Sequence, residues 1–323
     1  MDGSSTGISV FGCDAAEAAR FRELAPLYGC RVRLFEEELS ARTAGRAAGL
    51  RCVSVGHRTR IDRATLLALR GAGVEYLSTR SVGVNHIDGQ AAAELGLSIG
   101  NVDYSPDSVA DWTLMLMLMA LRHAASVVRR TDAHDYRLGP RGRELRDLTV
   151  GVVGTGRIGS AVIDRLRGFG GPVLAHDCRP RAGIEHVPLE ELLVRSDVVT
   201  LHAPLTPASH HLLDARRLGL LRPGAVVVNT GRGGLVDTEA LVVALEAGRL
   251  GGAALDVVEG EEGVFYTDRR GTTVDHELLM RLQALPNVLI SPHTAYYTEH
   301  ALTDIVTNTL RTCRAFENGR TLA

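Results

Sequence analysis

Three polar residues, each in a short motif of its own, have the types and spacing to do chemistry. They are Arg232 in NTGRG, Glu261 in ALDVVEGEE and His293 in SPHTA. An arginine holds a carboxylate in a fork of donors, and a histidine gives up a proton near neutral pH. A carboxylate beside the histidine favours the protonated ring. Each residue alone could be structural, but together they predict proton transfer to the carbonyl oxygen of a bound 2-keto acid.

A glycine-rich loop upstream predicts where the reductant binds. Residues 154–159 read GTGRIG, follow a strand-like run and open a helical stretch at 157–167, which is the context that the pattern needs. The helix N-terminus turns its positive end toward a pyrophosphate. Asp177 ends the next strand, where a carboxylate accepts from ribose hydroxyls and favours NAD. Arg179 and Arg181 follow and could accommodate a 2′-phosphate, so NADP stays open.

The elements that must position these groups alternate between short apolar runs and helical stretches, as in parallel α/β proteins. Helical periodicity covers Ala15 to Tyr28 and Asp62 to Arg70, with Asp62 as an N-cap. The first hundred residues thus predict one small doubly wound domain. Its five strands are expected at 7–13, 31–36, 52–56, 76–80 and 98–102.

A second series of runs, apolar on both faces as central parallel strands are, predicts a larger sheet. Arg232 and His293 then lie at carboxyl ends of strands and Glu261 a few residues past one, where open α/β sheets bind ligands. Between the two series a long apolar helix is expected from Ser108 to Arg130, crossing between the domains. The six strands of the series are expected at 148–154, 172–177, 197–202, 225–231, 251–258 and 287–293.

The last helical stretch, Thr298 to Asn318, precedes no further strand, so we expect it to pack back on the first domain. The prediction is therefore a discontinuous substrate domain, 1–103 plus 297–323, and a dinucleotide-binding Rossmann domain, 104–296. The fold class is α/β, with two doubly wound parallel sheets, the smaller one flavodoxin-like, and a crevice between them. Closure of the crevice on ligand would exclude water.

Composition excludes several other kinds of function. The formal net charge is −2 without a long run of one sign, so neither nucleic acid nor a membrane is expected as a partner. All 36 basic residues are arginine, which excludes a Schiff-base or Walker-type lysine. The five scattered cysteines and the acidic N-terminus MDGSSTG predict a cytoplasmic protein with reduced thiols. No metal site is predicted, because His202, His210 and His211 lack zinc-like spacing.

Five of the motifs resemble the D-2-hydroxyacid dehydrogenase family, namely VGVVGTGRIG, LHAPL, NTGRGGLVD, GAALDVVEGEE and SPHTA. The similarity runs over nearly the whole chain. Within the family, the sequence is most similar to the D-lactate dehydrogenases of glycopeptide (vancomycin) resistance, the VanH type. The stretches that carry this closer similarity include TRSVGVNHID, GNVDYSPDSVADWTLMLMLMA and SPHTAYYTE.

The resemblance implies a catalytic role for each of the three polar residues. Arg232 would bind the substrate carboxylate and polarise its carbonyl, and His293 would be the acid and base, with Glu261 as its partner. Asp256 is expected near the nicotinamide carboxamide. The cofactor-binding residues expected are Gly154, Gly156, Arg157, Ile158, Gly159, Asp177, Pro204, Thr230, Gly231 and Asp256.

Four further residues are expected around the substrate. The resemblance implies that backbone amides of Val82 and Gly83 clasp the substrate carboxylate. Tyr104 and Tyr296 match positions where lactate-type members place aromatic groups, although both could instead be packing residues at the hinge.

The activity that the resemblance implies is NAD(P)H-dependent reduction of pyruvate to D-lactate. The family usually forms homodimers through the cofactor domain, and the apolar helix from Ser108 is a candidate interface. The D-lactate would supply D-Ala-D-Lac peptidoglycan precursors that escape glycopeptide antibiotics. One alternative is a hydroxypyruvate or phosphoglycerate enzyme of the family, although Tyr104 and Tyr296 offer no charge to a phosphate. The other is a non-catalytic NAD-sensing partner protein, like the corepressors of this superfamily.

Overall fold

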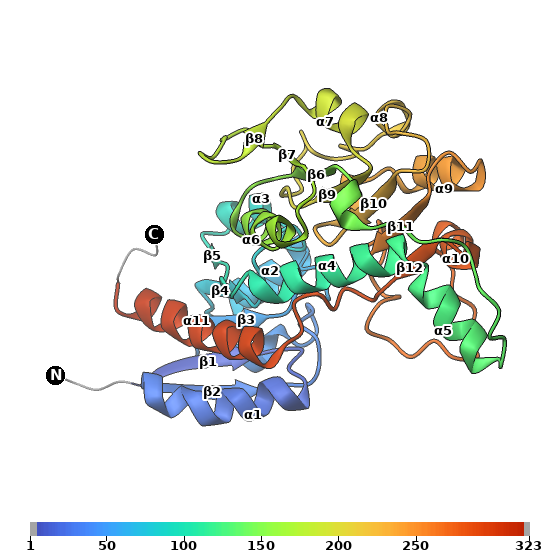
Figure 1. Cartoon of the computed structure of the whole chain (residues 1–323). Helices are drawn as coiled ribbons and strands as arrows, with labels where there is room; N and C mark the ends of the chain where they lie inside the picture. The colour runs from blue at the N-terminus through green and yellow to red at the C-terminus, as the bar shows by residue number, and fades with distance from the viewer. Residues whose placement is uncertain (1–4, 320–323) are drawn as a thin grey trace. The chain divides into compact units, whose positions relative to one another are not determined.

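The computed structural model describes residues 5–319 and divides into two compact units (Figure 1). The first unit contains the chain up to Ser105 and again from Tyr297, and the second spans Pro106–Tyr296. Both consist of a parallel sheet with helices, which confirms the predicted fold class of two α/β domains. The sequence prediction placed the first crossing after residue 103, and the structure divides after Ser105.

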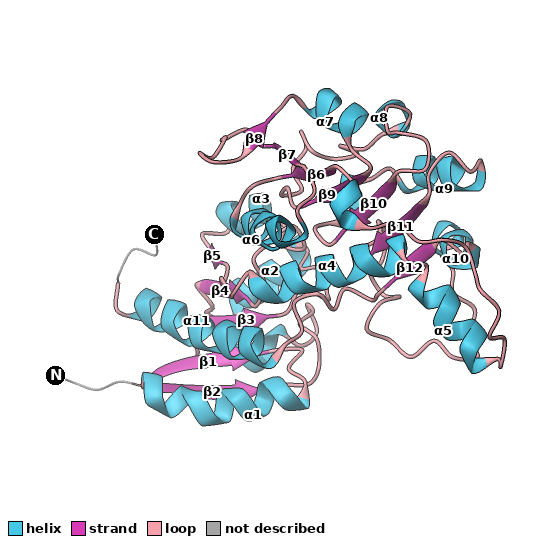
Figure 2. Cartoon of the chain, viewed as in Figure 1, coloured by secondary structure: helices cyan, strands magenta, loops and turns pink. Residues whose placement is uncertain are grey.

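The first unit has a five-stranded sheet in the order β2-β1-β3-β4-β5, with every pair parallel (Figure 2). This is the flavodoxin-like order, in which the chain switches direction between β1 and β3. All five predicted strands are present. Their bounds are β1 (Thr6–Val10), β2 (Cys30–Leu34), β3 (Cys52–Val55), β4 (Tyr76–Thr79) and β5 (Ser98–Gly100).

The α-helices of the first unit begin at side-chain caps. The carboxylate of Asp62 accepts from the N–H of Thr65, which confirms the predicted N-cap, and Asp14 and Asp88 cap their helices in the same way. The predicted helix 15–28 tightens into a 3₁₀ turn at its second half, which contains Pro26. The helices are α1 (Ala15–Leu24), η1 (Ala25–Tyr28), η2 (Ala44–Ala47), α2 (Arg63–Gly71), α3 (Gly89–Glu94) and α11 (Glu299–Glu317).

Helix α11 packs on the sheet of the first unit, as predicted, and completes one of its two hydrophobic clusters. Its buried Leu302, Val306 and Leu310 share that cluster with Ile8 of β1 and Tyr76 of β4. The first unit's core therefore consists of segments from both ends of the chain.

The second unit has a seven-stranded parallel sheet in the order β12-β11-β10-β9-β6-β7-β8. The order reverses between β6 and β9, and ligands of open α/β sheets bind at such a switch point. The predicted strands are all present, and the short β8 was not predicted. The bounds are β6 (Val150–Val153), β7 (Val173–His176), β8 (Glu185–His186), β9 (Val198–Leu201), β10 (Val226–Asn229), β11 (Gly252–Leu255) and β12 (Val288–Ile290).

The prediction of one continuous helix from Ser108 to Arg130 was wrong. Helix α4 (Asp107–Leu121) lies wholly within the second unit and packs on α6 and the sheet (Figure 1). It ends where the carbonyl of Leu121 accepts from the N–H of Arg143, and His123 then adopts a left-handed φ of 52°. Helix α5 (Ala124–Asp132) follows and buries no residue, so packing does not hold it in line with α4.

The remaining helices of the second unit connect its strands. They are η3 (Leu145–Asp147), α6 (Arg157–Leu166), η4 (Arg167–Phe169), α7 (Leu189–Arg195), α8 (Ala215–Leu218), η5 (Gly233–Leu235), α9 (Thr238–Glu246) and α10 (Glu277–Ala284). Two hydrophobic clusters cover the two faces of the sheet, one beneath α4 and α6 and the other beneath α7 to α10. In the described part of the chain, each helix is too short or too polar to cross a bilayer.

Candidate active site

His293 lies in the loop that follows β12 and has an unusual backbone. Its φ is 54°, in the left-handed region that non-glycine residues seldom occupy. The main-chain N–H of His293 donates to the carbonyl of Asp256 at 2.8 Å, and the hydroxyl of Tyr266 donates to the carbonyl of His293 at 2.7 Å. Strained backbone of this kind persists when surrounding contacts fix it, and it is concentrated at functional sites.

Asp256, at the end of β11, anchors the same loop. Its side chain is fully buried and accepts from the hydroxyl of Ser291 at 2.5 Å and from the N–H groups of Thr294 and Ala295 at 3.0 and 2.9 Å. A buried carboxylate needs such donors, because unpaired burial of its charge is costly. No local sequence pattern predicts these contacts, which hold the residues on both sides of His293.

Glu261 meets the imidazole of His293. Its Oε1 lies 2.5 Å from Nδ1 of His293, and its Oε2 accepts from the N–H of Val258 at 2.8 Å. Both side chains are mostly buried, with exposed fractions of 16% for Glu261 and 15% for His293. Both carboxylate oxygens are thus held, and the ring is oriented with Nδ1 toward Glu261.

Arg232 follows β10 in a loop that Asn229 shapes. The amide of Asn229 donates to the carbonyl of Arg232 at 2.9 Å and accepts from the N–H of Gly231 at 3.0 Å. A Cβ on Gly233 would lie 2.2 Å from the carbonyl carbon of Val258. Only glycine permits this approach, which brings the loop of Arg232 against the loop of Glu261.

The structure therefore brings the three predicted catalytic residues to neighbouring loops at the carboxyl end of one sheet. Arg232 is half-buried, and its Nη1 donates to the carbonyl of Gly231 at 2.7 Å. The arrangement offers a cation for an anionic substrate and a histidine–carboxylate pair for proton transfer.

The glycine loop after β6 fits a dinucleotide. A Cβ on Gly159 would lie 1.9 Å from the carbonyl oxygen of Gly154, and a Cβ on Gly154 would lie 2.6 Å from the carbonyl carbon of His202. Nothing lies within 4 Å of the corresponding position at Gly156, which is exposed and forms the N-cap of α6. Two glycines are thus needed for packing, and the third leaves open space at a helix N-terminus for a pyrophosphate.

Asp177 follows β7 beside this loop. Its Oδ2 accepts from the N–H of Thr155 at 2.6 Å, and its Oδ1 accepts from the N–H of Arg179 at 2.8 Å. Burial raises the pKa of Asp177, but these hydrogen bonds outweigh burial and hold the pKa below its ordinary value. The hydroxyl of Thr155 at 3.1 Å and the thiol of Cys178 at 3.5 Å also donate to this carboxylate, so ribose hydroxyls would have to replace one of these side-chain donors. Arg181 lies on the same side and donates from Nη1 to Ser160 at 3.1 Å.

The remaining predicted cofactor residues lie at the carboxyl ends of β9 and β10 and at the start of α6. Thr230 is buried, and its hydroxyl is 2.8 Å from that of Thr113 on α4. Pro204 is exposed, and its carbonyl accepts from Ser209 at 2.6 Å. Arg157 and Ile158 form the first turn of α6.

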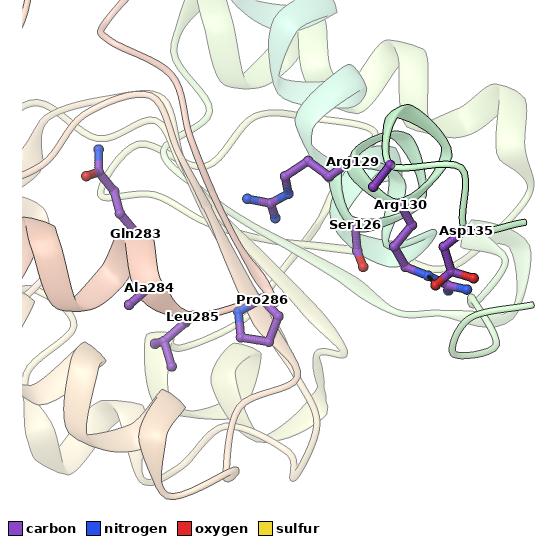
Figure 3. Close-up of a pocket in the computed structure, with 9 residues that line it drawn as sticks. Ser126, Arg129, Arg130, Asp135, Gln283, Ala284, Leu285 and Pro286 are labelled. Carbon is purple, nitrogen blue, oxygen red and sulfur yellow. Dashed lines mark hydrogen bonds and ion pairs between the residues drawn. The ribbon is translucent and has the colours of Figure 1, made fainter. Parts of the chain in front are cut away.

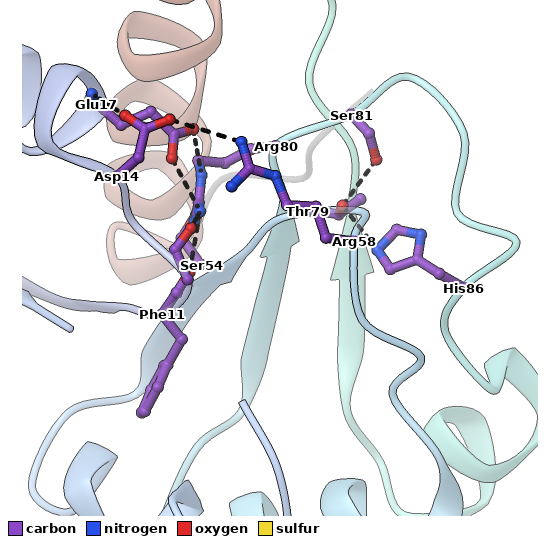
Figure 4. Close-up of polar contacts among 10 residues, drawn as sticks. Phe11, Asp14, Glu17, Ser54, Arg58, Thr79, Arg80, Ser81 and His86 are labelled. Carbon is purple, nitrogen blue, oxygen red and sulfur yellow. Dashed lines mark hydrogen bonds and ion pairs between the residues drawn. The ribbon is translucent and has the colours of Figure 1, made fainter. Parts of the chain in front are cut away.

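The loop with Val82 and Gly83 belongs to the first unit, where a polar network supports it (Figure 4). The hydroxyl of Ser81 donates to the carbonyl of Gly83 at 2.7 Å, and Asn101 donates to the carbonyl of Val82 at 2.8 Å. The hydroxyl of Thr79 lies 2.8 Å from the hydroxyl of Ser81 and 3.0 Å from Nε2 of His86. With both carbonyls engaged, the loop has a fixed backbone.

Arg80 ties this loop to the strands beneath it. The side chain is 1% exposed, and its guanidinium contacts Glu17 at 2.9 Å, Ser54 at 3.3 Å and the carbonyls of Phe11 and Gly12 at 2.9 Å each (Figure 4). The arginine thereby joins the carboxyl ends of β1, β3 and β4. Arg80 was not predicted from the sequence, because no local pattern distinguishes a buried arginine from an exposed one. Its burial requires the partners described above, since an unpaired buried charge is costly.

The two predicted tyrosines lie in different units. The ring of Tyr296 stands edge-on to that of His293, with centroids 6.5 Å apart, within the second unit. Tyr104 is half-buried and belongs to the first unit.

A separate pocket of about 390 Å³ opens in the second unit between α5 and the end of α10 (Figure 3). Arg129, Arg130 and Pro286 are among its lining residues, and Arg130 is paired with Asp135 at 2.8 Å. It contains none of the predicted site residues, so it does not extend the catalytic set.

Comparisons with known proteins show the family of this chain. The family model for "D-isomer specific 2-hydroxyacid dehydrogenase, NAD binding domain" matches residues 114–295. The chain is 53% identical over 314 residues to a "D-specific alpha-keto acid dehydrogenase" of Enterococcus faecalis, with 97% of each chain covered.

Two solved structures share the fold over almost the whole chain. The pyruvate reductase of Chlamydomonas reinhardtii has a TM-score of 0.88 and 33% identity, covering 99% of this chain and 98% of that one. A D-lactate dehydrogenase from Aquifex aeolicus, complexed with NAD and lactic acid, has a TM-score of 0.86 and 31% identity, covering 97% and 96%.

Proposed function

Because the chain belongs to the D-isomer specific 2-hydroxyacid dehydrogenase family and has its NAD-binding domain, we propose that it reduces pyruvate to D-lactate with NADH. The observation that carries the proposal is the contact between Glu261 and His293 beside the loop of Arg232. A non-catalytic NAD-sensing protein would have no need for an oriented proton donor next to a cation.

The proposed mechanism divides the work among these three residues. Arg232 binds the substrate carboxylate and stabilises negative charge as it develops on the carbonyl oxygen. With Nδ1 of His293 committed to Glu261, the proton that reaches this oxygen comes from Nε2. Glu261 holds the ring in position and stabilises its protonated form before transfer. NADH, when bound, supplies the hydride to C2 of the substrate.

The cofactor would be held by the loop after β6. The N-terminus of α6 at Gly156 would hold the pyrophosphate, and Asp177 would accept from the adenosine ribose. A 2′-phosphate would meet the negative charge of Asp177, which favours NADH. Arg179 and Arg181 are the groups that would receive NADPH if it is also used.

Pyruvate is proposed as the substrate on two grounds. The relatives of similar fold include a pyruvate reductase and a D-lactate dehydrogenase complexed with lactic acid. The ring of Tyr296 lies beside His293 and offers an apolar edge to a small substrate side chain. Backbone amides of Val82 and Gly83 are proposed to bind the substrate carboxylate as well.

Initial rates of NADH and NADPH oxidation test the proposal, measured with pyruvate, 2-ketobutyrate, hydroxypyruvate and 3-phosphohydroxypyruvate, with the product's chirality determined. Fast formation of D-lactate is expected with pyruvate. A preference for 3-phosphohydroxypyruvate or hydroxypyruvate would move the assignment to the other branch of the family. Tight NADH binding without turnover of any keto acid would favour the sensing protein.

A role in glycopeptide resistance is the further part of the proposal. It is supported by the resemblance to the VanH-type enzymes and by 53% identity to the E. faecalis protein. D-lactate from this enzyme would supply a D-alanine:D-lactate ligase and so D-Ala-D-Lac precursors. Mass spectrometry of precursors from cells with and without the gene tests this, and unchanged D-Ala-D-Lac content would contradict it.

We propose a cytoplasmic homodimer as the working form. Its support is the usual dimerisation of this family through the cofactor domain, where α4 carries the partly exposed Met115. Light scattering after size-exclusion chromatography should give twice the monomer mass, and a monomer mass would remove α4 as an interface.

A further inference from the structure

A second group of ionisable side chains lies on the surface of the second unit, outside the catalytic set. It consists of His210 and His211, in the segment after β9, and Glu259, in the segment after β11. The two imidazole rings are stacked with centroids 3.9 Å apart and planes at 25°. Nε2 of His210 lies 3.2 Å from Oε1 of Glu259, and Nε2 of His211 lies 3.1 and 3.0 Å from its two oxygens.

These separations are near the edge lengths of a metal coordination polyhedron. With metal–nitrogen and metal–oxygen distances of about 2.0–2.2 Å, ligand atoms of a tetrahedral site lie about 3.3–3.6 Å apart. The ligand atoms of the cluster all lie within 4.8 Å of one another. The nitrogen–oxygen contacts of 3.0–3.2 Å are hydrogen bonds slightly shorter than that edge, so a bound ion would replace them and turn the stacked rings until both Nε2 lone pairs point at it. Two imidazoles and a carboxylate are also the donor set of a common zinc site with one open position.

We propose that His210, His211 and Glu259 bind a divalent transition metal ion, with Zn²⁺ as the natural candidate. Nε2 of each histidine and one oxygen of Glu259 supply three ligands. The side chains are 51%, 34% and 38% exposed, so the ion has a path from solvent and water can take the fourth position. The prediction of no metal site was based on the spacing of His202, His210 and His211 and did not include Glu259.

The surrounding structure supports the ligands. The main-chain N–H of His211 donates to the carbonyl of Gly234 at 2.8 Å, and Nδ1 of His211 lies 4.0 Å from Asp237. A carboxylate near the second ring nitrogen is the usual outer partner of a metal-bound histidine. On the other side, Nε2 of His276 donates to the carbonyl of Glu259 at 2.8 Å. The ligands therefore sit on segments held by neighbours outside the cluster.

Direct titration of the metal-free protein with Zn²⁺, in competition with a chromogenic chelator, tests the proposal. The titration uses a Cys178→Ser background, because Cys178 is the exposed thiol and could bind zinc itself. One equivalent of Zn²⁺ is expected to bind and to raise the thermal unfolding midpoint. Glu259→Gln, His210→Gln and His211→Gln should each weaken binding by about tenfold or more.

Matched controls identify the site. Glu262→Gln removes an exposed carboxylate from the same acidic run, and His300→Gln removes an exposed histidine from the first unit. Both should bind Zn²⁺ like the parent. His293→Gln reports whether the ion binds at the catalytic pair instead. Co²⁺ provides a spectroscopic readout, since nitrogen and oxygen ligands give visible bands without the near-ultraviolet charge-transfer band of a thiolate.

Three results would overturn the proposal. Unchanged Zn²⁺ affinity in Glu259→Gln and in the two histidine variants would remove these residues as ligands. Loss of binding in His293→Gln alone would place the ion at the catalytic pair, and a thiolate band with Co²⁺ would place it at a cysteine. If Glu259→Gln fails to fold without metal, His210→Gln decides the matter, because its side chain is half exposed and its replacement leaves the core unchanged.

Discussion

The hydroxyl of Tyr266 donates a 2.7 Å hydrogen bond to the main-chain oxygen of His293, the residue with a left-handed backbone. The bond helps to hold the imidazole in a conformation that the loop alone would not favour. Tyr266 thus acts on the proposed proton transfer through the backbone of His293.

Tyr266→Phe should lower kcat by about fivefold, since the bond contributes about 1 kcal/mol to holding His293 in place. Steady-state kinetics with pyruvate check this. Tyr136→Phe, at a tyrosine that is 74% exposed, is the control and should leave kcat unchanged. Equal kcat values for Tyr266→Phe and the parent would show that the remaining contacts of the loop are sufficient to hold His293 in place.

Glu261→Gln should reduce kcat with pyruvate by about 10² to 10⁴, because the amide cannot stabilise a protonated His293. The KM for NADH should change little, since Glu261 is not in the cofactor loop. Glu262→Gln next to it is the control, because Glu262 is exposed and belongs to the same acidic run. Similar losses in both variants would mean that the acidic run acts as a whole, which would contradict the assignment.

Gly156→Ala should fold normally and bind NADH poorly. Nothing lies within 4 Å of the added methyl group in the protein, but the group would occupy the space proposed for the pyrophosphate. Calorimetric titration with NADH, together with the unfolding midpoint, separates the two effects. Gly168→Ala, where the added methyl group also meets nothing, should match the parent in both. Unchanged NADH affinity in Gly156→Ala would exclude this loop as the pyrophosphate site.

Replacement of Asp177 by Ser should shift the preference toward NADPH. The change removes the charge that opposes a 2′-phosphate and keeps a hydroxyl as an acceptor for Thr155. The ratio of kcat/KM for NADH to that for NADPH should fall by about tenfold or more, which corresponds to about 1.4 kcal/mol. A constant ratio would indicate that Asp177 acts only on the loop through Thr155.

His202 should make the stability of the second unit sensitive to acid. Burial lowers the pKa of His202 from 6.5 to about 3; its Nδ1 is shielded from solvent and has no hydrogen-bond partner. Below pH 6.5 the unfolded chain binds a proton that the folded chain does not. The contribution of His202 to stability is therefore complete above pH 6.5 and declines as the pH falls toward 3.

Urea unfolding at about pH 7.5 and about pH 5 measures this contribution. His202→Gln keeps a polar group near Thr200 and cannot be protonated, so it should lose less stability than the parent between the two pH values. His300→Gln, which removes an exposed histidine of the first unit, should behave like the parent. A parallel loss in all three proteins would mean that His202 is accessible to protons in the folded state.

Most strands and the proposed catalytic set could be predicted from the sequence because local signals specify them. Runs such as AVVVNTG are apolar on both faces, and the residue that follows each one lies at a fixed edge of the sheet. Asp62 before α2 shows that a cap can also be recognised locally. The order of strands within each sheet then brings Arg232, Glu261 and His293 to adjacent loops.

Other features depend on contacts between distant residues and left no local signal. Asp256 is joined to Ser291, and Glu259 to His210, by side chains 35 and 49 positions apart. The break between α4 and α5 depends on Arg143, which caps Leu121 from a later loop. The buried Arg80 looks like any other arginine in a sequence that has no lysine.

The use of both ends of the chain in one core sets an order for biosynthesis. A ribosome completes residues 106–296 before it makes α11, so the nucleotide-binding unit can form its core while the chain is still growing. The first unit is synthesised earlier, but its core cannot be completed until α11 has been made. Ile8 and Tyr76 share their hydrophobic cluster with Leu302 and Leu310 of that helix. Until then this apolar sheet face is open to chaperones and to aggregation, and a stop codon before α11 would leave it so permanently.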